Sequence, residues 1–362
     1  MSPIMEHITK VVGGETHIND LSLNFAAGTF QVLLGRTLAG KTTLMRLIAG
    51  LDWPTSGRIL ANGVDVTGVS VRKRNISMVY QQFINYPNLT VFENIASPLK
   101  LQKIDKSQIE GRVRATAVKL GMEPYLQRYP LELSGGQQQR TAMARALVKE
   151  ADLILLDEPL VNLDYKLREE LREEMREIFT LRKTLVIYAT SEPSEALALG
   201  GMTTVLHEGR VVQQGPTPQV YQKPTTALAA SLFSEPPINL FSGQVAADEV
   251  TFDNQVHFPL NSDLKHLPTG HYLFGIRPHH LSLQPVHPND LELGVTVDLA
   301  EISGSETFLH VKHRETDMVL HLEGVHQFEV DASLPIYLPT HKLFVFTPDG
   351  DLIHIPRSAA QG

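Results

Sequence analysis

The chain has 362 residues, of which 42% are hydrophobic, so it is longer than one typical domain and can bury large cores. Its net charge of -8 and pI of about 6.0 exclude a large basic surface for nucleic acid. It contains no cysteine, which excludes disulfides and suits a reducing compartment. We find neither a signal peptide nor an apolar run of roughly 18 residues, and expect a chain that is neither exported nor embedded in a membrane.

Charge and histidine content divide the chain near residue 238. Residues 1–238 contain 26 basic and 24 acidic residues, whereas residues 239–362 contain 6 and 16. Twelve of the fifteen histidines lie in the second part. The sequence Ser-Glu-Pro-Pro at 234–237 is typical of a linker. We therefore expect two domains, 1–238 and 239–362.

The first domain alternates short apolar runs with helical patterns, which is typical of an α/β fold with a parallel sheet. We expect strands at 30–34, 153–156 and 185–188. A helix is expected from 164 to 182, where charged residues such as Arg168 form a solvated face. Its apolar face consists of residues at helical spacing, namely Leu167, Leu171, Met175 and Ile178.

A phosphate-binding loop pattern follows the first of these strands. Residues 35–43 read Gly-Arg-Thr-Leu-Ala-Gly-Lys-Thr-Thr and precede a helical pattern. Backbone N–H groups in such a loop cradle phosphates, Lys41 reaches the β and γ phosphates, and the Thr42 hydroxyl coordinates Mg²⁺. We expect ATP to be bound by the residues of this loop, in particular Gly35, Arg36, Gly40, Lys41, Thr42 and Thr43.

Two carboxylates end the strand at 153–156. Asp157 and Glu158 would lie at the carboxyl edge of the sheet, where ligands of α/β proteins bind. Asp157 can hold the metal through water, and Glu158 can orient or activate the attacking water. Taken alone, the segment is equally well explained as a strand followed by an acidic turn. The phosphate-binding loop favours the catalytic interpretation.

The sequence Leu-Ser-Gly-Gly-Gln at 133–137 lies between these motifs and resembles the LSGGQ signature of ATP-binding cassette (ABC) ATPases. Its glycines permit close backbone approach to a phosphate, and the following helix N-terminus supplies donors. The alternative is a plain glycine-rich helix start, which the flanking motifs disfavour. In the family this segment acts on ATP held by the opposing subunit. The resemblance therefore implies a dimer whose second nucleotide contacts are Ser134, Gly135, Gly136 and Gln137.

The resemblance assigns further roles by position. Gln81 corresponds to the Q-loop residue that senses the metal and γ-phosphate, so Thr42, Gln81 and Asp157 are the implied Mg²⁺ ligands. Asp164 belongs to the D-loop, which crosses the dimer interface. Residues 83–93 correspond to the segment where the family's membrane subunits dock. Ordinary packing of its aromatic residues is an equally good explanation.

The second domain has β-rich runs at 272–276, 295–299, 307–311 and 342–346, separated by turn residues, and we expect a small β-barrel. The turns Gly-Ile-Arg-Pro at 275–278 and Gly-Ser-Glu-Thr at 304–307 resemble those of the oligonucleotide-fold-like (OB-like, TOBE/MOI) regulatory domain of maltose-type and glycerol-phosphate-type importer ATPases. The resemblance implies import of a sugar or polyol, and it is strongest to glycerol importers. His279 and His280 are expected at the surface or in packing rather than as metal ligands.

Four positions depart from the family pattern. Ser191 stands where the family has a switch histidine that contacts the γ-phosphate, and Val12 stands where an aromatic residue stacks on adenine. Arg-Thr-Leu at 36–38 replaces Pro-Ser-Gly, and Val161 replaces a small residue. Binding of Mg²⁺-ATP should survive these changes. If Ser191 lines the site, hydrolysis should slow by about 10²- to 10⁴-fold.

The mixture of intact and altered motifs suggests pairing with a distinct second ATPase subunit in a heterodimer. The further partners implied are two membrane-spanning permease subunits and, indirectly, a periplasmic or extracellular solute-binding protein. The implied location is the cytoplasmic face of the bacterial inner membrane. Two alternatives stay open: a weakly hydrolytic module that closes on ATP and leaves turnover to its partner, and a regulatory role in which the acidic second domain captures a signalling protein.

Overall fold

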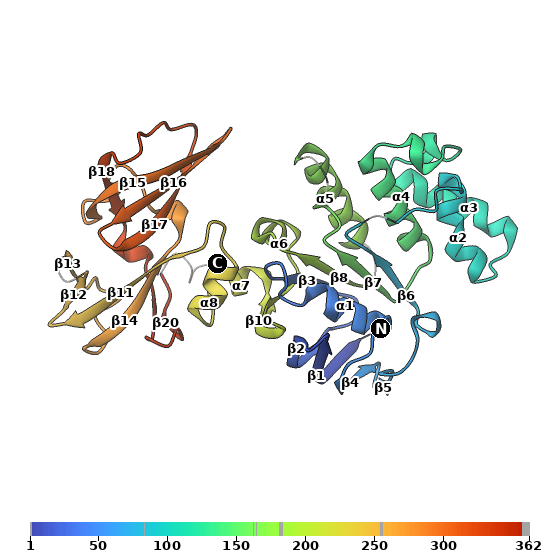
Figure 1. Ribbon diagram of the computed structural model, residues 1–362, viewed down its shortest axis with the longest axis horizontal. Helices are drawn as coiled ribbons and strands as arrows, with labels where there is room; N and C mark the ends of the chain where they lie inside the picture. The colour runs from blue at the N-terminus through green and yellow to red at the C-terminus, as the bar shows by residue number, and fades with distance from the viewer. Residues whose placement is uncertain are drawn as a thin grey trace. The chain divides into compact units, whose positions relative to one another are not determined.

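The computed structural model describes residues 2–82, 84–161, 163, 165–180, 184–253 and 256–356, without the side chains of residues 177 and 180. The chain forms two compact units, Met1–Thr217 and Pro218–Gly362 (Figure 1). Within the described residues, no helix has both the length and the hydrophobicity needed to cross a bilayer.

The boundary between the units lies before the predicted one at 238. The reason is the packing of two short helices, α7 (Thr217–Gln222) and α8 (Ala227–Leu232). Ala227 and Ala230 of α8 share a buried cluster with Phe344 and Phe346 of the second unit. The Pro-Pro sequence at 236–237 therefore lies inside the second unit, not between the units.

A six-stranded sheet forms the centre of the first unit, in the order β10-β9-β3-β8-β7-β6. All neighbouring pairs are parallel except β9 and β10. The carboxyl ends of the parallel strands therefore share one edge. The strands are β3 (Phe30–Leu34), β6 (Ile76–Val79), β7 (Leu153–Asp157), β8 (Leu185–Thr190), β9 (Met202–His207) and β10 (Arg210–Pro216). The expected strands at 30–34, 153–156 and 185–188 are confirmed.

A second, antiparallel sheet has the order β2-β1-β4-β5. Helix α1 (Lys41–Ala49) joins the two sheets, because its apolar residues share one buried cluster with both of them; Leu44 and Ile48 are fully buried there. This packing fixes the N-terminus of α1 at the carboxyl edge of the parallel sheet. The strands of the second sheet are β1 (Pro3–Val12), β2 (Glu15–Asn24), β4 (Ser56–Ala61) and β5 (Val64–Asp65).

Further α-helices of the first unit are labelled in Figure 1. Helices α2 (Val91–Leu101), α3 (Lys106–Lys119) and α4 (Gly135–Val148) pack on one another. Helix α5 (Tyr165–Thr180) confirms the helix predicted at 164–182, with Leu171 and Met175 fully buried. Helix α6 (Pro193–Leu199) follows β8.

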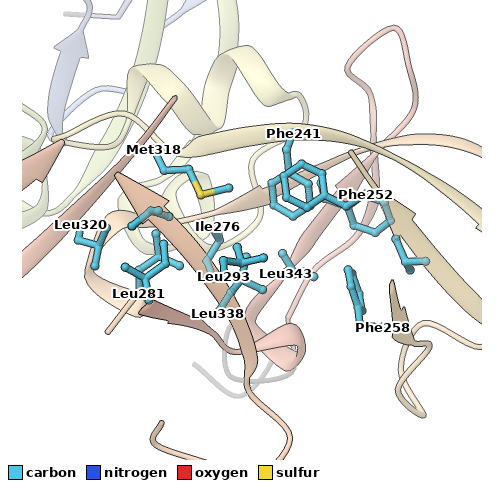
Figure 2. Packing of buried hydrophobic residues seen from close by; sticks show 14 of the residues in the cluster. Phe241, Phe252, Phe258, Ile276, Leu281, Leu293, Met318, Leu320, Leu338 and Leu343 are labelled. Carbon is cyan, nitrogen blue, oxygen red and sulfur yellow. The ribbon is translucent and has the colours of Figure 1, made fainter. Parts of the chain in front are cut away.

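The second unit contains two antiparallel sheets, in the orders β13-β12-β11-β14-β19-β20 and β17-β16-β15-β18. They share one core, in which Phe241 and Phe252 lie side by side (Figure 2). The ring centroids of Phe241 and Phe252 are 4.5 Å apart, and the ring of Phe241 also stacks on that of Phe274. The strands are β11 (Asn239–Ala246), β12 (Glu249–Phe252), β13 (Val256–Pro259), β14 (Gly270–Ile276), β15 (Leu291–Ser303), β16 (Glu306–His313), β17 (Thr316–Glu323), β18 (Ser333–Leu338), β19 (Phe344–Phe346) and β20 (Leu352–His354).

These strands agree with the all-β domain predicted after residue 238, with one difference in the extent of a strand. The run expected to be a strand at 342–346 begins as the short helical turn Thr340–Lys342, and only Phe344–Phe346 pairs with neighbours. His279 is exposed and His280 is half-buried, and their rings form an edge-to-face pair 4.2 Å apart.

Candidate active site

Four loops meet at the carboxyl edge of the parallel sheet. The loop after β3 carries residues 35–40, and the loop after β6 carries Gln81. Glu158 follows β7, and Ser191 follows β8. A cavity of about 400 Å³ lies beside the N-terminus of α1. It is lined by residues 37–43, by Gln81 and Glu158, and by residues 15–17 of strand β2. The structure therefore places the predicted phosphate loop, Q-loop residue and carboxylate around one space.

The shape of the phosphate loop depends on Gly40. This residue has a φ of 100°, which L-amino acids rarely adopt, and it precedes α1 without a side chain to cap the first N–H groups of the helix. A Cβ atom at Gly40 would lie 2.8 Å from the carbonyl oxygen of His17. The loop is thus pressed against strand β2, and the start of α1 faces the cavity with its positive dipole end.

The ammonium group of Lys41 is held inside the loop. Its Nζ donates to the carbonyl oxygens of Gly35, at 2.6 Å, and Arg36, at 3.2 Å, and it pairs with Glu158 Oε1 at 3.0 Å. Only 5% of the Lys41 side chain is exposed. A buried cation with this many acceptors is satisfied electrostatically, and an incoming phosphate must compete with these partners for it. The side chain of Arg36 itself is exposed.

Thr42 and Asp157 form the second polar pair of the site. The Thr42 hydroxyl donates to Asp157 Oδ1 at 3.0 Å, and Asp157 is 3% exposed. Burial raises the pKa of Asp157, the hydrogen bond from Thr42 opposes this, and the nearby charge of Glu158 adds to it. Hydroxyl and carboxylate oxygens with the Gln81 amide nearby are the hard oxygen donors that Mg²⁺ prefers. These residues therefore fit a magnesium ion.

Glu158 occupies an unusual backbone conformation. Its φ of 44° costs a non-glycine residue about 1–2 kcal/mol. The backbone N–H of Glu158 donates to the carbonyl oxygen of Ala189 at 3.0 Å, which fixes the turn after β7. The side chain lines the cavity beside Lys41. Such strained positions concentrate at functional sites, which supports a catalytic role for this carboxylate.

Ser191 and Val12 lie outside the lining of the cavity. Ser191 is half-buried directly after β8, whose Thr190 carbonyl accepts a hydrogen bond from the N–H of Gly35 at 3.2 Å. Val12 ends strand β1 and is 46% exposed. The D-loop residues Asn162 and Asp164, like Phe83 of the expected docking segment, lie outside the described residues.

The signature segment caps helix α4. The Ser134 hydroxyl accepts a hydrogen bond from the N–H of Gln137, and the Gln137 side-chain oxygen accepts one from the N–H of Ser134 at 3.0 Å. Ser134 and Gly135 are exposed, whereas Gly136 is buried so closely that a Cβ atom would lie 2.1 Å from Leu167 Cδ2. None of these residues lines the cavity of its own chain.

A buried carboxylate that belongs to none of the sequence motifs lies beneath the loop after β8. Glu195 Oε2 accepts hydrogen bonds from the Tyr188 hydroxyl, at 2.9 Å, and the Thr190 hydroxyl, at 2.6 Å. Thr190 Oγ1 in turn accepts from the N–H of Glu192 at 3.0 Å. Burial raises the pKa of Glu195. The alternation of Tyr188 and Thr190 on one strand face was the signal in the sequence that could have revealed this network.

Arg168 also has a role that the sequence did not predict. Its guanidinium donates to both carboxylate oxygens of Glu192, at 2.6 and 2.8 Å, and to the carbonyl oxygen of Val161 at 3.5 Å. The expectation that Arg168 belongs to a merely solvated face of α5 is therefore wrong. The side chain connects the start of α5 with the loop that carries Ser191.

Glu195 should make stability depend on pH. Because its pKa is raised in the folded chain above the usual 4.5, the folded chain binds the proton more tightly, and the free energy of unfolding falls as pH rises from 4.5 through the folded pKa. Glu195→Gln should remove this fall, since one amide oxygen can accept both hydroxyl hydrogen bonds. Urea unfolding of both proteins between pH 4 and 8 measures the difference. Parallel curves would show that Glu195 does not carry the dependence.

Comparison with known proteins agrees with this geometry. A family model described as "ABC transporter" matches residues 18–161. The sn-glycerol-3-phosphate import ATP-binding proteins UgpC of Salmonella typhimurium and Escherichia coli O157:H7 are each 35% identical over 350 residues, covering 96% of this chain and 97% of the relative. UgpC of Burkholderia pseudomallei is 34% identical over 351 residues, covering 95% and 97%.

A solved structure is similar to part of the chain. It is the dimeric structure of a post-hydrolysis state of the ATP-binding cassette MJ0796 bound to ADP and Pi. The identity is 27% and the TM-score 0.54, and the match covers 59% of this chain and 98% of that one. Since the curated relatives match almost from end to end, this chain belongs to the family of ABC transporter ATP-binding proteins.

Proposed function

We propose that this ABC ATPase energises the import of glycerol 3-phosphate or a closely related sugar or polyol. The supporting observation is the similarity to sn-glycerol-3-phosphate import proteins, which extends over 96% of the chain and so includes the second unit. The ATPase core alone would not separate importers from other ABC proteins, because fold and site chemistry are shared. The chain would act at the cytoplasmic face of the bacterial inner membrane.

The site geometry supports a specific division of roles. Lys41 and the N–H groups at the start of α1 hold the phosphates, while Thr42, Asp157 and Gln81 would hold Mg²⁺. The metal ion, when bound, neutralises charge on the phosphate oxygens. Binding of phosphates draws Lys41 away from Glu158, and the released carboxylate orients the attacking water and accepts its proton.

Ser191 is the proposed modifier of turnover. Ser191 lies directly after β8 but outside the lining of the cavity, so its proposed contact with the γ-phosphate requires the loop after β8 to move toward the nucleotide. In that position serine, which cannot carry a positive charge, would stabilise the developing charge on the γ-phosphate less than histidine would. We expect Ser191→His to raise kcat for ATP by about tenfold or more, with the affinity for ATP changed only a few-fold. Steady-state ATPase assays of the purified chain measure both. An unchanged kcat would exclude Ser191 from the reacting site.

The dimer is proposed to consist of two copies of this chain. The expected distinct second ATPase subunit finds no support in the comparisons and is not favoured. The reason is physical, since Lys41, Thr42, Asp157 and Glu158 are all present and in contact, and the signature at 133–137 is intact. Two such chains would complete two equivalent sites. The exposed Ser134 and Gly135 would then meet the nucleotide of the opposing copy.

A groove on the first unit is the proposed contact with the membrane subunits. Its volume is about 280 Å³, and it lies between β6, α2 and α4. Two exposed apolar residues border it, Ile84 at 60% and Tyr86 at 44%, and the guanidinium of Arg145 lies 4.3 Å from the centre of the Tyr86 ring. Exposed apolar side chains beside a groove are suited to a docked helix. Asn85, between them, donates to the backbone oxygen of Gln138 at 2.8 Å.

The second unit is proposed to be the OB-like regulatory domain of this importer class. Its antiparallel sheets around a single core and the nearly full-length match to the import proteins support this assignment. The permease subunits and, indirectly, a solute-binding protein are the partners that an importer requires.

An uptake experiment tests the proposed cargo. In cells whose chromosomal gene carries Glu158→Gln, uptake of radiolabelled glycerol 3-phosphate should be lost, and a plasmid with the unmodified gene should restore it. Glycerol and maltose serve as competing cargo candidates in the same cells. Loss of uptake of another solute, with glycerol 3-phosphate unaffected, would reassign the cargo. If no uptake changes, the import function is wrong, although the ATPase activity of the purified chain would stand.

A further inference from the structure

Two sets of residues contribute to the walls of the cavity. The first set is Lys41, Gln81 and Glu158, where the β and γ phosphates of ATP are expected, and the second set is residues 15–17 of strand β2. Thr43 follows Thr42 along α1 and faces β2, because its hydroxyl lies 3.4 Å from Nδ1 of His17. With the terminal phosphates at Lys41, we expect the rest of a nucleotide to extend past Thr43 toward β2.

His17 supplies a flat ring in that second set of residues. Among the described residues that line the cavity it is the one aromatic side chain. Its backbone is fixed against the phosphate loop, because its carbonyl oxygen lies where a Cβ atom of Gly40 or of Gly209 would clash. The N–H of Asn19, two residues on, donates to the carbonyl oxygen of Gly209 at 3.0 Å. The backbone of His17 is therefore held at a set position relative to the phosphate loop, and its side chain is half-buried.

Val12 cannot supply such a surface. It is aliphatic and 46% exposed, and it does not line the cavity. A nucleobase gains little free energy on meeting a small branched side chain, whereas stacking on an aromatic ring stabilises a bound base. In this chain the flat surface beside the phosphate loop comes from the opposite strand of the same hairpin, β2 instead of β1.

We propose that His17 contacts the adenosine part of ATP and determines how strongly this chain prefers a nucleotide over phosphates alone. The inference rests on the proposed assignment of the cavity as the ATP site. His17 would contact the adenine ring or the ribose of ATP. It would not contact the β and γ phosphates, which Lys41 and the phosphate loop bind.

Binding of two ligands separates these roles. His17→Leu keeps the side-chain size but removes the ring, and His17→Phe keeps a ring but removes the nitrogens. We expect His17→Leu to weaken binding of a non-hydrolysable ATP analogue by about tenfold and to leave binding of tripolyphosphate unchanged, both with Mg²⁺ and measured by calorimetry. His17→Phe should retain most of the affinity for the analogue. His7→Leu, an exposed histidine on β1, is the control and should change neither.

A second variant keeps the test decisive. Val12→Trp in the His17→Leu background should restore affinity for the analogue if a ring beside the loop is what is missing. Equal losses for the analogue and tripolyphosphate would show that His17 only supports Thr43 and the phosphate loop, and would overturn the inference. No change in either ligand would overturn it as well. If the unmodified chain binds neither ligand, the assignment of the ATP site fails instead.

Discussion

Glu158→Gln is expected to slow ATP hydrolysis by about 10²- to 10⁴-fold while binding of Mg²⁺-ATP persists or becomes tighter. The carboxylate has two roles in the structure. It lines the cavity, where it can take a proton from water, and it pairs with Lys41 at 3.0 Å. Glutamine has the same shape but neither accepts the proton nor holds the ammonium group by charge. Removing this competitor leaves Lys41 more available to phosphate.

The measurement is steady-state hydrolysis together with equilibrium binding of ATP. Glu208→Gln is a matched control, because Glu208 also has a positive φ, of 46°, but is 85% exposed in the turn between β9 and β10. It should leave both quantities unchanged. Hydrolysis by Glu158→Gln within a few-fold of the unmodified chain would show that another group activates the water. Weaker ATP binding would show that the Lys41–Glu158 pair organises the loop instead of competing with phosphate.

Gly40→Ala should weaken binding of Mg²⁺-ATP by about 100-fold. The methyl group would lie 2.8 Å from the carbonyl oxygen of His17 and 2.9 Å from Ile18 Cδ1, at a φ of 100° that alanine avoids. One of these contacts is backbone and cannot rotate away, so the loop must move. The N–H groups at the start of α1 would then no longer point at the phosphates.

Gly63→Ala is the control for backbone strain alone. Gly63 has a φ of 80° in the turn between β4 and β5, and a Cβ atom there meets nothing within 4 Å. It should cost some stability without altering ATP binding. Thermal unfolding of both variants separates loss of folding from loss of the site. Normal ATP binding by a folded Gly40→Ala protein would show that close packing against β2 does not set the shape of the phosphate loop.

The sequence predicted those parts of the site that are encoded locally. The strand, loop and helix around Lys41 form one contiguous segment, and so do the strand and carboxylates at 153–158. In each segment, the hydrophobic pattern predicts the secondary structure and the adjacent polar residues predict the chemistry. The parallel order of the strands then brings the ends of β3, β6 and β7 to one edge. The position of Gln81 at the site was implied only by the resemblance to ABC ATPases, and the sheet order explains why it lines the same cavity as Lys41 and Glu158.

Contacts between distant segments could not be predicted in this way. Arg168 looked like one charge among many on a helix surface, and only the fold places it against Glu192 and the carbonyl of Val161. Glu195 carried no motif, yet it is buried beneath β8. The two compact units divide at 217/218 and not at the expected domain boundary of 238, because a Pro-Pro sequence is a local cue, whereas the packing of α8 with Phe344 and Phe346 is not.

The hydrogen bond from Asn85 to the backbone of Gln138 joins the groove segment to the first turn of the helix that carries the signature. A membrane subunit bound in the groove and a nucleotide bound by the opposing copy would thus both contact the N-terminal end of α4 or the segment bonded to it. When two ligands bind to sites that are coupled through one structural element, each ligand changes the binding free energy of the other by the same amount. If docking of the membrane subunit raises the affinity for ATP by some factor, binding of ATP must therefore raise the affinity for the membrane subunit by the same factor.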